Sequence, residues 1–144
     1  MIRSITQNDR EVFIRLSEEF YNSDAVLKPI PHSFHEALFD ELMRSDTYAE
    51  CYLFEEQGTV VGYAQLSKTY SREAGGNVLL IEEIYIIPSF RGRGLATEFF
   101  DFIHKRADTA RFRLEVEPEN EGAVKLYKRM GYRFLDYKQM IKGN

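Results

Sequence analysis

Apolar residues follow a helical spacing in the first third of the chain. A short apolar run at 2–5 indicates a strand, and residues 12–20 then place apolar side chains on one face of a helix. The same spacing returns over 33–43, after Pro29 and Pro31, which are incompatible with a regular helix. The pattern predicts one strand followed by two helices.

The middle of the chain changes to the pattern of strands. Residues 49–55 and 59–68 are strand-like on either side of a turn that contains Gly58, which is typical of a hairpin. The polar segment 70–77 is predicted to be a loop. A long β-branched run over 78–87, interrupted by two acids, predicts a further strand.

The last third of the chain alternates between the two patterns. A helix is predicted from a glycine-containing turn to about residue 107, a strand over 111–116, a second helix over 123–130, and one or two closing strands over 132–141. This order of elements predicts a mixed sheet covered by helices, an α/β or α+β fold, in a single domain spanning 1–144.

The composition excludes several classes of protein. The 19 basic and 23 acidic residues give a net charge of −4, which argues against a nucleic-acid binder with a basic footprint. The single cysteine, Cys51, excludes an internal disulfide, and neither it nor the three histidines has metal-ligand spacing. No apolar run is long enough to span a membrane, and the polar start lacks a signal-peptide core. We therefore predict a cytoplasmic domain with no metal and no membrane or nucleic-acid partner.

The most informative segment is the turn that joins the strand at 78–87 to the helix after it. It reads Arg91-Gly92-Arg93-Gly94-Leu95-Ala96. A strand-to-helix turn with glycines offers unpaired N–H groups and the positive end of a helix dipole, which suit a phosphate or pyrophosphate. The spacing matches neither a Walker loop nor a dinucleotide fingerprint. The simpler alternative is a tight turn with solvated arginines.

Two motifs resemble the GNAT N-acetyltransferase superfamily, and the likeness runs from about Val78 to Phe134. Arg91, Gly94 and Ala96 fill the defined positions of the acetyl-CoA signature, [Arg/Gln]-x-x-Gly-x-[Gly/Ala], after a strand and a proline-containing turn. A second motif, N-x-x-A-x-x-L-Y-x-x-x-G-[Phe/Tyr], is matched in order by Asn120, Ala123, Leu126, Tyr127, Gly131 and Tyr132. Two motifs in the right order are more specific than either one alone.

The resemblance implies how acetyl-CoA, the expected co-substrate, would be held. It implies a mostly antiparallel sheet in which one strand splays from its neighbour, so that the pantetheine arm lies in the gap. Main-chain groups of Ile84, Tyr85 and Ile86 would bond that arm. The N–H groups of the turn would hold the pyrophosphate, through Arg91, Gly92, Arg93, Gly94, Leu95 and Ala96. Asn120 would contact the cofactor beyond the thioester, and Tyr127 would point at the sulfur.

Two adjacent acids are candidates for handling the amine. An amine with a pKa near 10 must lose a proton before it attacks a thioester. Strand alternation predicts that Glu82 and Glu83 face opposite sides of the sheet, with Glu82 on the side of Ile84 and Ile86. Glu82 is similar to an acid that contacts the amine in polyamine-type members, so we favour it as base, through water, or as amine anchor. Glu115 resembles the glutamate of members that acetylate protein N-termini and is the competing base. Solvated strand acids are the simpler alternative.

Tyr127 is the predicted acid for the leaving thiolate. The thiol pKa of about 8.5 and the tyrosine pKa of about 10 differ by a small amount, so donation of a hydrogen bond followed by proton transfer is feasible. A main-chain N–H near Ile84 would stabilise the developing oxyanion. No covalent enzyme intermediate is needed, and most of the rate would come from holding amine and thioester together. Without the motif, the helical spacing of Tyr127 would favour a core position.

The sequence therefore predicts an acetyl-CoA-dependent N-acetyltransferase that acts on a primary amine by direct attack in a ternary complex. The acids favour a cationic small molecule or peptide without selecting one. The alternative is a non-catalytic module that binds acyl-CoA as a sensor. A homodimer is compatible with the chain, because two-fold pairs are common among oligomers.

Overall fold

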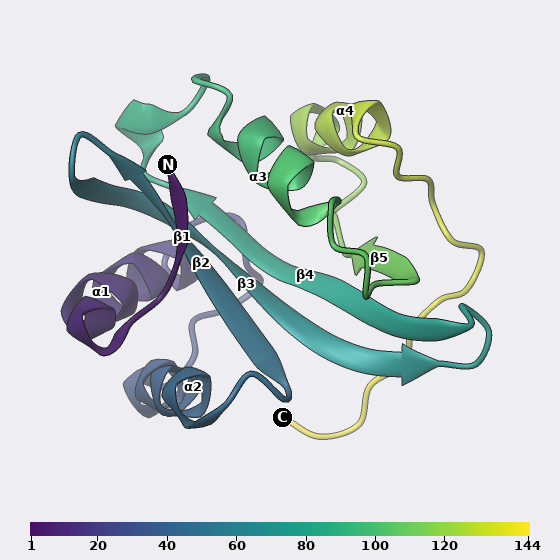
Figure 1. Cartoon of the computed structure of the whole chain (residues 1–144), viewed down its shortest axis with the longest axis horizontal. Coiled ribbons are helices and arrows are strands. Elements are labelled where there is room, and N and C mark those ends of the chain that lie inside the picture. Colours follow the sequence, from purple (N-terminus) through teal and green to yellow (C-terminus); the bar gives the residue numbers. More distant parts are fainter.

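Five strands form one open sheet in the order β1-β2-β3-β4-β5 (Figure 1). The computed structural model describes residues 1–144. The strands are β1 (Ile2–Ser4), β2 (Ala49–Glu56), β3 (Thr59–Ser71), β4 (Gly76–Ile86) and β5 (Arg111–Leu114). Neighbours from β1 to β4 are antiparallel, and only β5 runs parallel to β4. The predicted mixed, mostly antiparallel sheet is confirmed.

Helices cover both faces of this sheet. The α-helices are α1 (Arg10–Tyr21), α2 (His32–Arg44), α3 (Leu95–Ile103) and α4 (Glu121–Arg129), and two short 3-10 turns are η1 (Gln7–Asp9) and η2 (Pro88–Phe90). In Figure 1, α1 and α2 lie on one side of the strands, and α3 and α4 on the other. None of the helices has the length and apolar character needed to cross a membrane.

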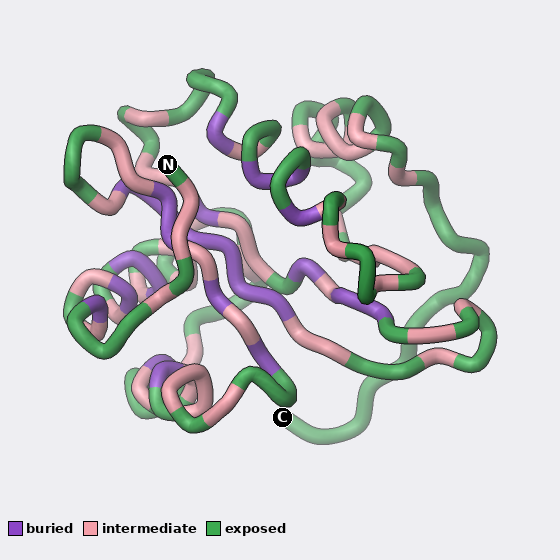
Figure 2. The backbone as a smooth tube through the Cα atoms, viewed as in Figure 1, coloured by how far each residue is buried: buried purple, intermediate pink, exposed green.

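Each face of the sheet carries its own apolar core. Buried side chains of the α3 face are Phe54, Val61, Ala64, Leu66, Leu79, Ile81, Leu95, Phe99, Phe100 and Ile103. Those of the α1/α2 face are Phe13, Leu16, Phe39, Cys51, Leu53, Tyr63 and Tyr85. Figure 2 shows the buried stretches concentrated in the central strands and the helix faces turned toward them. Cys51 is a buried thiol, and burial raises its pKa well above the ordinary value.

Two predicted boundaries are wrong. Segment 70–77 is a loop only over 72–75, because β3 and β4 continue to pair as far as Ser71 and Gly76. Its polar side chains reflect exposure of the hairpin end rather than a loop. The closing strands over 132–141 do not form, and Tyr137, Met140 and Ile141 are 78%, 98% and 88% exposed. A strand needs a paired neighbour, and after Tyr132 the main chain makes no hydrogen bond within the chain.

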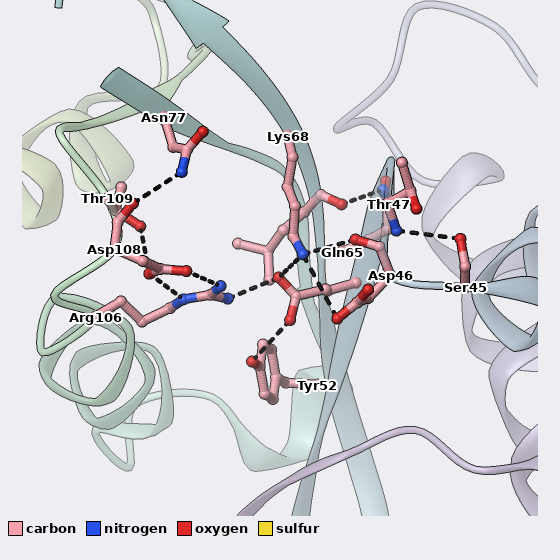
Figure 3. Close-up of polar contacts among 12 residues, drawn as sticks. Ser45, Asp46, Thr47, Tyr52, Gln65, Lys68, Asn77, Arg106, Asp108 and Thr109 are labelled. Carbon is pink, nitrogen blue, oxygen red and sulfur yellow. Dashed lines mark hydrogen bonds and ion pairs between the residues drawn. The ribbon is translucent and has the colours of Figure 1, made fainter. Parts of the chain in front are cut away.

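A polar network fixes the loop between α3 and β5 to the sheet (Figure 3). The Arg106 guanidinium donates to Glu50 of β2 at 2.7 Å and to Asp108 at 3.0 Å. The Lys68 ammonium of β3 lies 3.0 Å from the same Glu50 carboxylate. The Asn77 side chain of β4 donates to the Asp108 main-chain oxygen at 3.2 Å. These contacts attach the segment just before β5 to β2, β3 and β4.

Candidate active site

β4 carries an irregularity at the position of the paired acids. Gln65 of β3 pairs with Glu83, while the next β3 residue, Leu66, pairs with Ile81, so Glu82 is an extra residue without a partner. A bulge of this kind bends a strand and changes which face each later side chain takes. As a result Ile81 and Ile84 both pack on the α3 face, although they are three positions apart.

The bulge overturns the alternation expected for the two acids. Glu82 does not lie on the same face of the sheet as Ile84, because the bulge puts Ile81 on that face instead. Glu82 is exposed at the bulge, whereas Glu83 points to the α1/α2 face. Burial raises the pKa of the Tyr21 hydroxyl, and the charges of Glu83 and Glu82 raise it further. Both carboxylates therefore act on the same neighbourhood instead of on opposite sides of the sheet.

Glu83 is the most enclosed of the candidate acids. Its Oε1 accepts a hydrogen bond from the Tyr63 hydroxyl at 2.7 Å, and its Oε2 accepts one from the Tyr21 hydroxyl at 2.7 Å. Burial raises the pKa of the Glu83 carboxyl, the two hydroxyls lower it, and the charge of Glu82 raises it. No lysine or arginine contacts the carboxylate. The site thus holds a carboxylate supported by neutral donors alone.

Two further acids, Glu19 and Glu115, differ in their hydrogen bonding. Tyr85, on the same face as Tyr63, donates its hydroxyl to Glu19 of α1 at 3.1 Å, which adds a further carboxylate to the α1/α2 face. Glu115, the competing base, is exposed just after β5 ends at Leu114 and makes no side-chain hydrogen bond. The position of Glu115 in the chemistry stays a prediction.

β4 and β5 separate where the expected cofactor gap lies. Their pairing covers only Val78 to Ile81 on β4, and β5 stops at Leu114. β4 continues to Ile86, so its last five residues have no strand partner on the β5 side. The main-chain groups of Ile84 to Ile86 lie in this unpaired stretch, although the Ile86 carbonyl accepts a hydrogen bond from the Arg91 side chain at 2.8 Å.

The turn after β4 presents a continuous row of free donors. No main-chain N–H from Gly92 to Thr97 donates a hydrogen bond within the chain. Gly92 and Gly94 have φ values of 77° and 81°, a left-handed conformation that glycine adopts without strain. Gly94 is also the N-cap of α3, so the positive end of the helix dipole adds to these donors. An anion such as a pyrophosphate fits this arrangement.

The two arginines of the turn are engaged with protein groups. Arg93 donates to Glu56 at 2.9 Å and lies over the Phe90 ring. Arg91 bonds the Ile86 carbonyl and lies over the Tyr85 ring. The guanidinium groups therefore help to shape the turn, and their role toward an anion stays a prediction.

Tyr127 combines packing with an unused hydroxyl. Its ring packs edge-on against Phe100 at 5.7 Å between centroids, on the α3 face. Burial alone raises the pKa of its hydroxyl, which makes no hydrogen bond within the chain. Tyr127 lines a cavity of about 840 Å³ bounded by β5, α4 and the C-terminal segment. The ring thus packs in the core while the hydroxyl stays available, and the catalytic role of Tyr127 stays a prediction.

Comparison with known proteins identifies the family of this chain. A family model described as "Acetyltransferase (GNAT) family" matches residues 11–132. The chain belongs to the GNAT acetyltransferase family. A thialysine N-epsilon-acetyltransferase of Mus musculus is 37% identical over 115 residues, which cover 67% of this chain and 65% of that protein. An uncharacterized N-acetyltransferase of Methanocaldococcus jannaschii is 30% identical over 153 residues, covering 99% of this chain and 63% of that protein. The chain thus spans less than two thirds of the length of both relatives.

Solved structures agree with the GNAT fold. A possible acetyltransferase from Clostridium difficile 630 superposes with a TM-score of 0.86 at 19% identity and covers 100% of this chain and 97% of its own. An aminoglycoside N-acetyltransferase in complex with CoA gives a TM-score of 0.80 at 19% identity, covering 99% of this chain and 93% of its own. At these identities the likeness establishes the fold of the GNAT chain.

Three residues around the GNAT site were not found from the sequence. Tyr21 and Tyr63 hold Glu83, and Gly62 lets β4 approach β3. Tyr63 follows the alternation of β3, so its face was predictable, but nothing marks its hydroxyl as a partner of an acid. Asn120, predicted to meet the cofactor, caps α4 by accepting from the Ala123 N–H at 3.2 Å, and its contact with a cofactor stays a prediction.

Proposed function

We propose that this chain transfers an acetyl group from acetyl-CoA to a primary amine by direct attack in a ternary complex. The observation that carries the proposal is the row of free N–H groups from Gly92 to Thr97, placed at the end of a strand that loses its partner. That combination offers a seat for a pyrophosphate followed by an open strand edge for an amide-containing arm.

Different main-chain groups of this chain would bind different parts of the cofactor. The turn N–H groups would neutralise the pyrophosphate, and main-chain groups of Ile84 to Ile86 would hydrogen-bond the pantetheine arm in the gap beside β4. Acetyl-CoA supplies an activated acyl carbon and a thiolate that can leave. The bulge at Glu82 leaves main-chain donors of β4 unpaired near this point, where one would stabilise negative charge on the carbonyl oxygen.

The amine would approach from the α1/α2 face. Glu83, Glu82 and Glu19 make that side negative, so it attracts an ammonium group. Relatives named for thialysine and aminoglycosides support a small cationic amine as the substrate class. Glu82, exposed at the bulge, is suited to accept the amine proton through water, and Glu83 is suited to anchor the ammonium.

Tyr127 would approach from the other face. It belongs to the α3-side core, while Glu83 contacts the α1/α2-side core, so β4 stands between them. With the acid on one side and the tyrosine on the other, proton removal and proton donation would occur at opposite ends of the reacting groups. Tyr127 would donate its free hydroxyl to the departing sulfur.

Binding and turnover test the proposal separately. Calorimetry with acetyl-CoA is expected to show binding well below about 1 mM, and its absence at that concentration would remove the cofactor assignment. A panel of alkylamines, diamines, amino acids and peptides, assayed by released thiol, is expected to identify an acceptor. Binding of acetyl-CoA with slow thioester hydrolysis alone would favour the non-catalytic module instead.

A further inference from the structure

Glu83 is a half-buried acid whose side-chain hydrogen-bond donors are both tyrosines. Buried carboxylates in proteins are ordinarily paired with a cation, because desolvation of an unpaired charge is unfavourable. Glu83 has no such partner, since Tyr21 and Tyr63 are its only side-chain hydrogen-bond donors and it forms no ion pair. The carboxylate therefore lacks the positive partner that would stabilise it fully, and a ligand can supply one.

The two tyrosines that hold Glu83 differ in how firmly they are fixed. Tyr63 lies in the middle of β3, is fully buried, and its ring packs against Phe13 and Tyr85 at 5.3 and 6.3 Å between centroids. Its hydroxyl cannot leave Glu83 Oε1 without disturbing the core. Tyr63 is a permanent support for the carboxylate.

Tyr21 is held much less firmly. It is the last residue of α1, it is only half-buried, and residues 22–31 that follow form neither helix nor strand. Its ring has two edge-on aromatic neighbours, Phe20 and His35. The hydroxyl on Glu83 Oε2 is thus the one contact of the carboxylate that a small movement of the helix end can release.

We propose that Tyr21 is a specificity-determining gate: its hydroxyl occupies the Glu83 oxygen that the substrate ammonium takes, and the amine binds by displacing it. An ammonium forms a charge-assisted hydrogen bond, which is stronger than the bond from a neutral hydroxyl. A neutral or poorly basic acceptor forms a bond to Glu83 that is too weak to replace the hydrogen bond from Tyr21. The gate therefore selects cationic acceptors. This inference rests on the proposed function, because it takes Glu83 as the amine anchor.

The test compares Tyr21→Phe with the unchanged chain. Binding of n-butylamine and 1,4-diaminobutane is measured by calorimetry at pH 8.5, where most of each amine is protonated. Removal of the competing hydroxyl is expected to tighten amine binding by about three- to tenfold, the worth of one net hydrogen bond. Tyr70→Phe, exposed on β3, is the matched control and leaves amine binding unchanged.

Two further variants make the result decisive. In a Glu83→Gln background, Tyr21→Phe is expected to have no effect on amine binding, because the shared carboxylate is gone. Tyr63→Phe is expected to weaken amine binding, since the anchor loses its fixed support. Equal or weaker amine binding in Tyr21→Phe, or no amine binding by the unchanged chain, overturns the gate.

Failure of the proposed function has a separate signature. It would appear as an absence of acetyl-CoA binding or of acetyl transfer, while the amine-binding comparison can still be made. Where turnover is present, the gate also predicts a lower KM for the amine in Tyr21→Phe at an unchanged KM for acetyl-CoA. A parallel change in both constants would point to a structural effect of the substitution and would contradict the gate.

Discussion

Gly62 of β3 lies directly opposite Ile86 of β4, with no room for a side chain between them. A Cβ built at Gly62 would lie 2.4 Å from the Tyr85 carbonyl oxygen and 3.1 Å from Ile86 Cα. The atoms it would meet are mainly backbone, so they cannot turn away. The close approach keeps the final residues of β4 flat on β3, and these are the residues that border the candidate cofactor gap.

Substitution Gly62→Ala is expected to destabilise the fold by about 1–3 kcal/mol, the usual range for overpacking. The same change at Gly122, in the first turn of α4, meets no atom within 4 Å and serves as the matched control. Alanine there is expected to stabilise by up to about 1 kcal/mol, because it favours helix more than glycine does. Urea unfolding of the two variants measures both values. Equal stabilities would show that β4 can move away from Gly62 freely.

The turn from Arg91 to Ala96 is the part of the candidate site that was most fully predictable from sequence. Gly92 and Gly94 were expected in a strand-to-helix turn, and both have the left-handed backbone that only glycine takes easily. The information was local, since a turn is determined by a few consecutive residues. The same holds for Tyr127, whose motif spans one helix.

The acid site was less predictable because it depends on contacts between distant parts of the chain. Glu83 and Tyr21 are 62 positions apart, and no pattern in α1 marks Tyr21 as a partner of β4. The bulge at Glu82 has no signal in the alternation of a run that is apolar on both faces. One extra residue was enough to remove Glu82 from the side of Ile84, where the alternation had placed it.

Replacement of Tyr127 by phenylalanine tests its predicted role as acid. The ring contact with Phe100 is retained, so the unfolding temperature should change little. Loss of the hydroxyl is expected to lower kcat by about 10- to 100-fold, at the low end for general acid catalysis because a thiolate leaves readily. Tyr137→Phe, 78% exposed in the C-terminal segment, is the control. Unchanged kcat across the pH profile would leave Tyr127 with a packing role only.

The contact between Arg3 and Asp9 predicts how stability depends on pH. The Arg3 guanidinium donates to both Asp9 oxygens at 2.9 and 2.8 Å, and the Thr6 main chain adds a third donor at 2.7 Å. The Arg3 hydrogen bonds, chiefly, lower the pKa of the Asp9 carboxyl from 3.8 to about 2. A carboxyl with a lowered pKa in the folded state stabilises that state above its unfolded pKa, and the contribution disappears as pH falls.

The Asp9 carboxyl should therefore contribute about 2 kcal/mol to the free energy of unfolding above a pH of about 4. That contribution should be lost as the pH falls from about 4 to about 2. Urea unfolding at a series of pH values measures the slope. Asp9→Asn is expected to be less stable at neutral pH and to show a shallower fall in acid. A slope as steep as that of the unchanged chain would assign the acid sensitivity to other carboxyls.

Three glutamine variants separate the candidate acids by what each one changes. Glu83→Gln removes the charge of the anchor and is expected to raise the KM of the amine by about 10- to 100-fold, the range for losing a bond to a charged group. Glu82→Gln removes the base proposed to act through water, and its kcat should fall mainly at low pH, where the amine is most protonated. Glu115→Gln should change neither constant, because Glu115 is exposed and makes no contact with the Tyr21 and Glu83 pair.

The pH dependence of activity shows which of the three carboxyls acts as the base. A base must be deprotonated to work, so activity rises with pH through its pKa, and burial moves that rise to higher pH for Glu83 than for an ordinary carboxyl. If Glu83→Gln abolishes the low-pH dependence while Glu82→Gln keeps it, Glu83 is the base and the exposed acid at the bulge only attracts the substrate. If only Glu115→Gln abolishes it, the proton leaves on the β5 side of the gap, and the α1/α2 face serves binding alone.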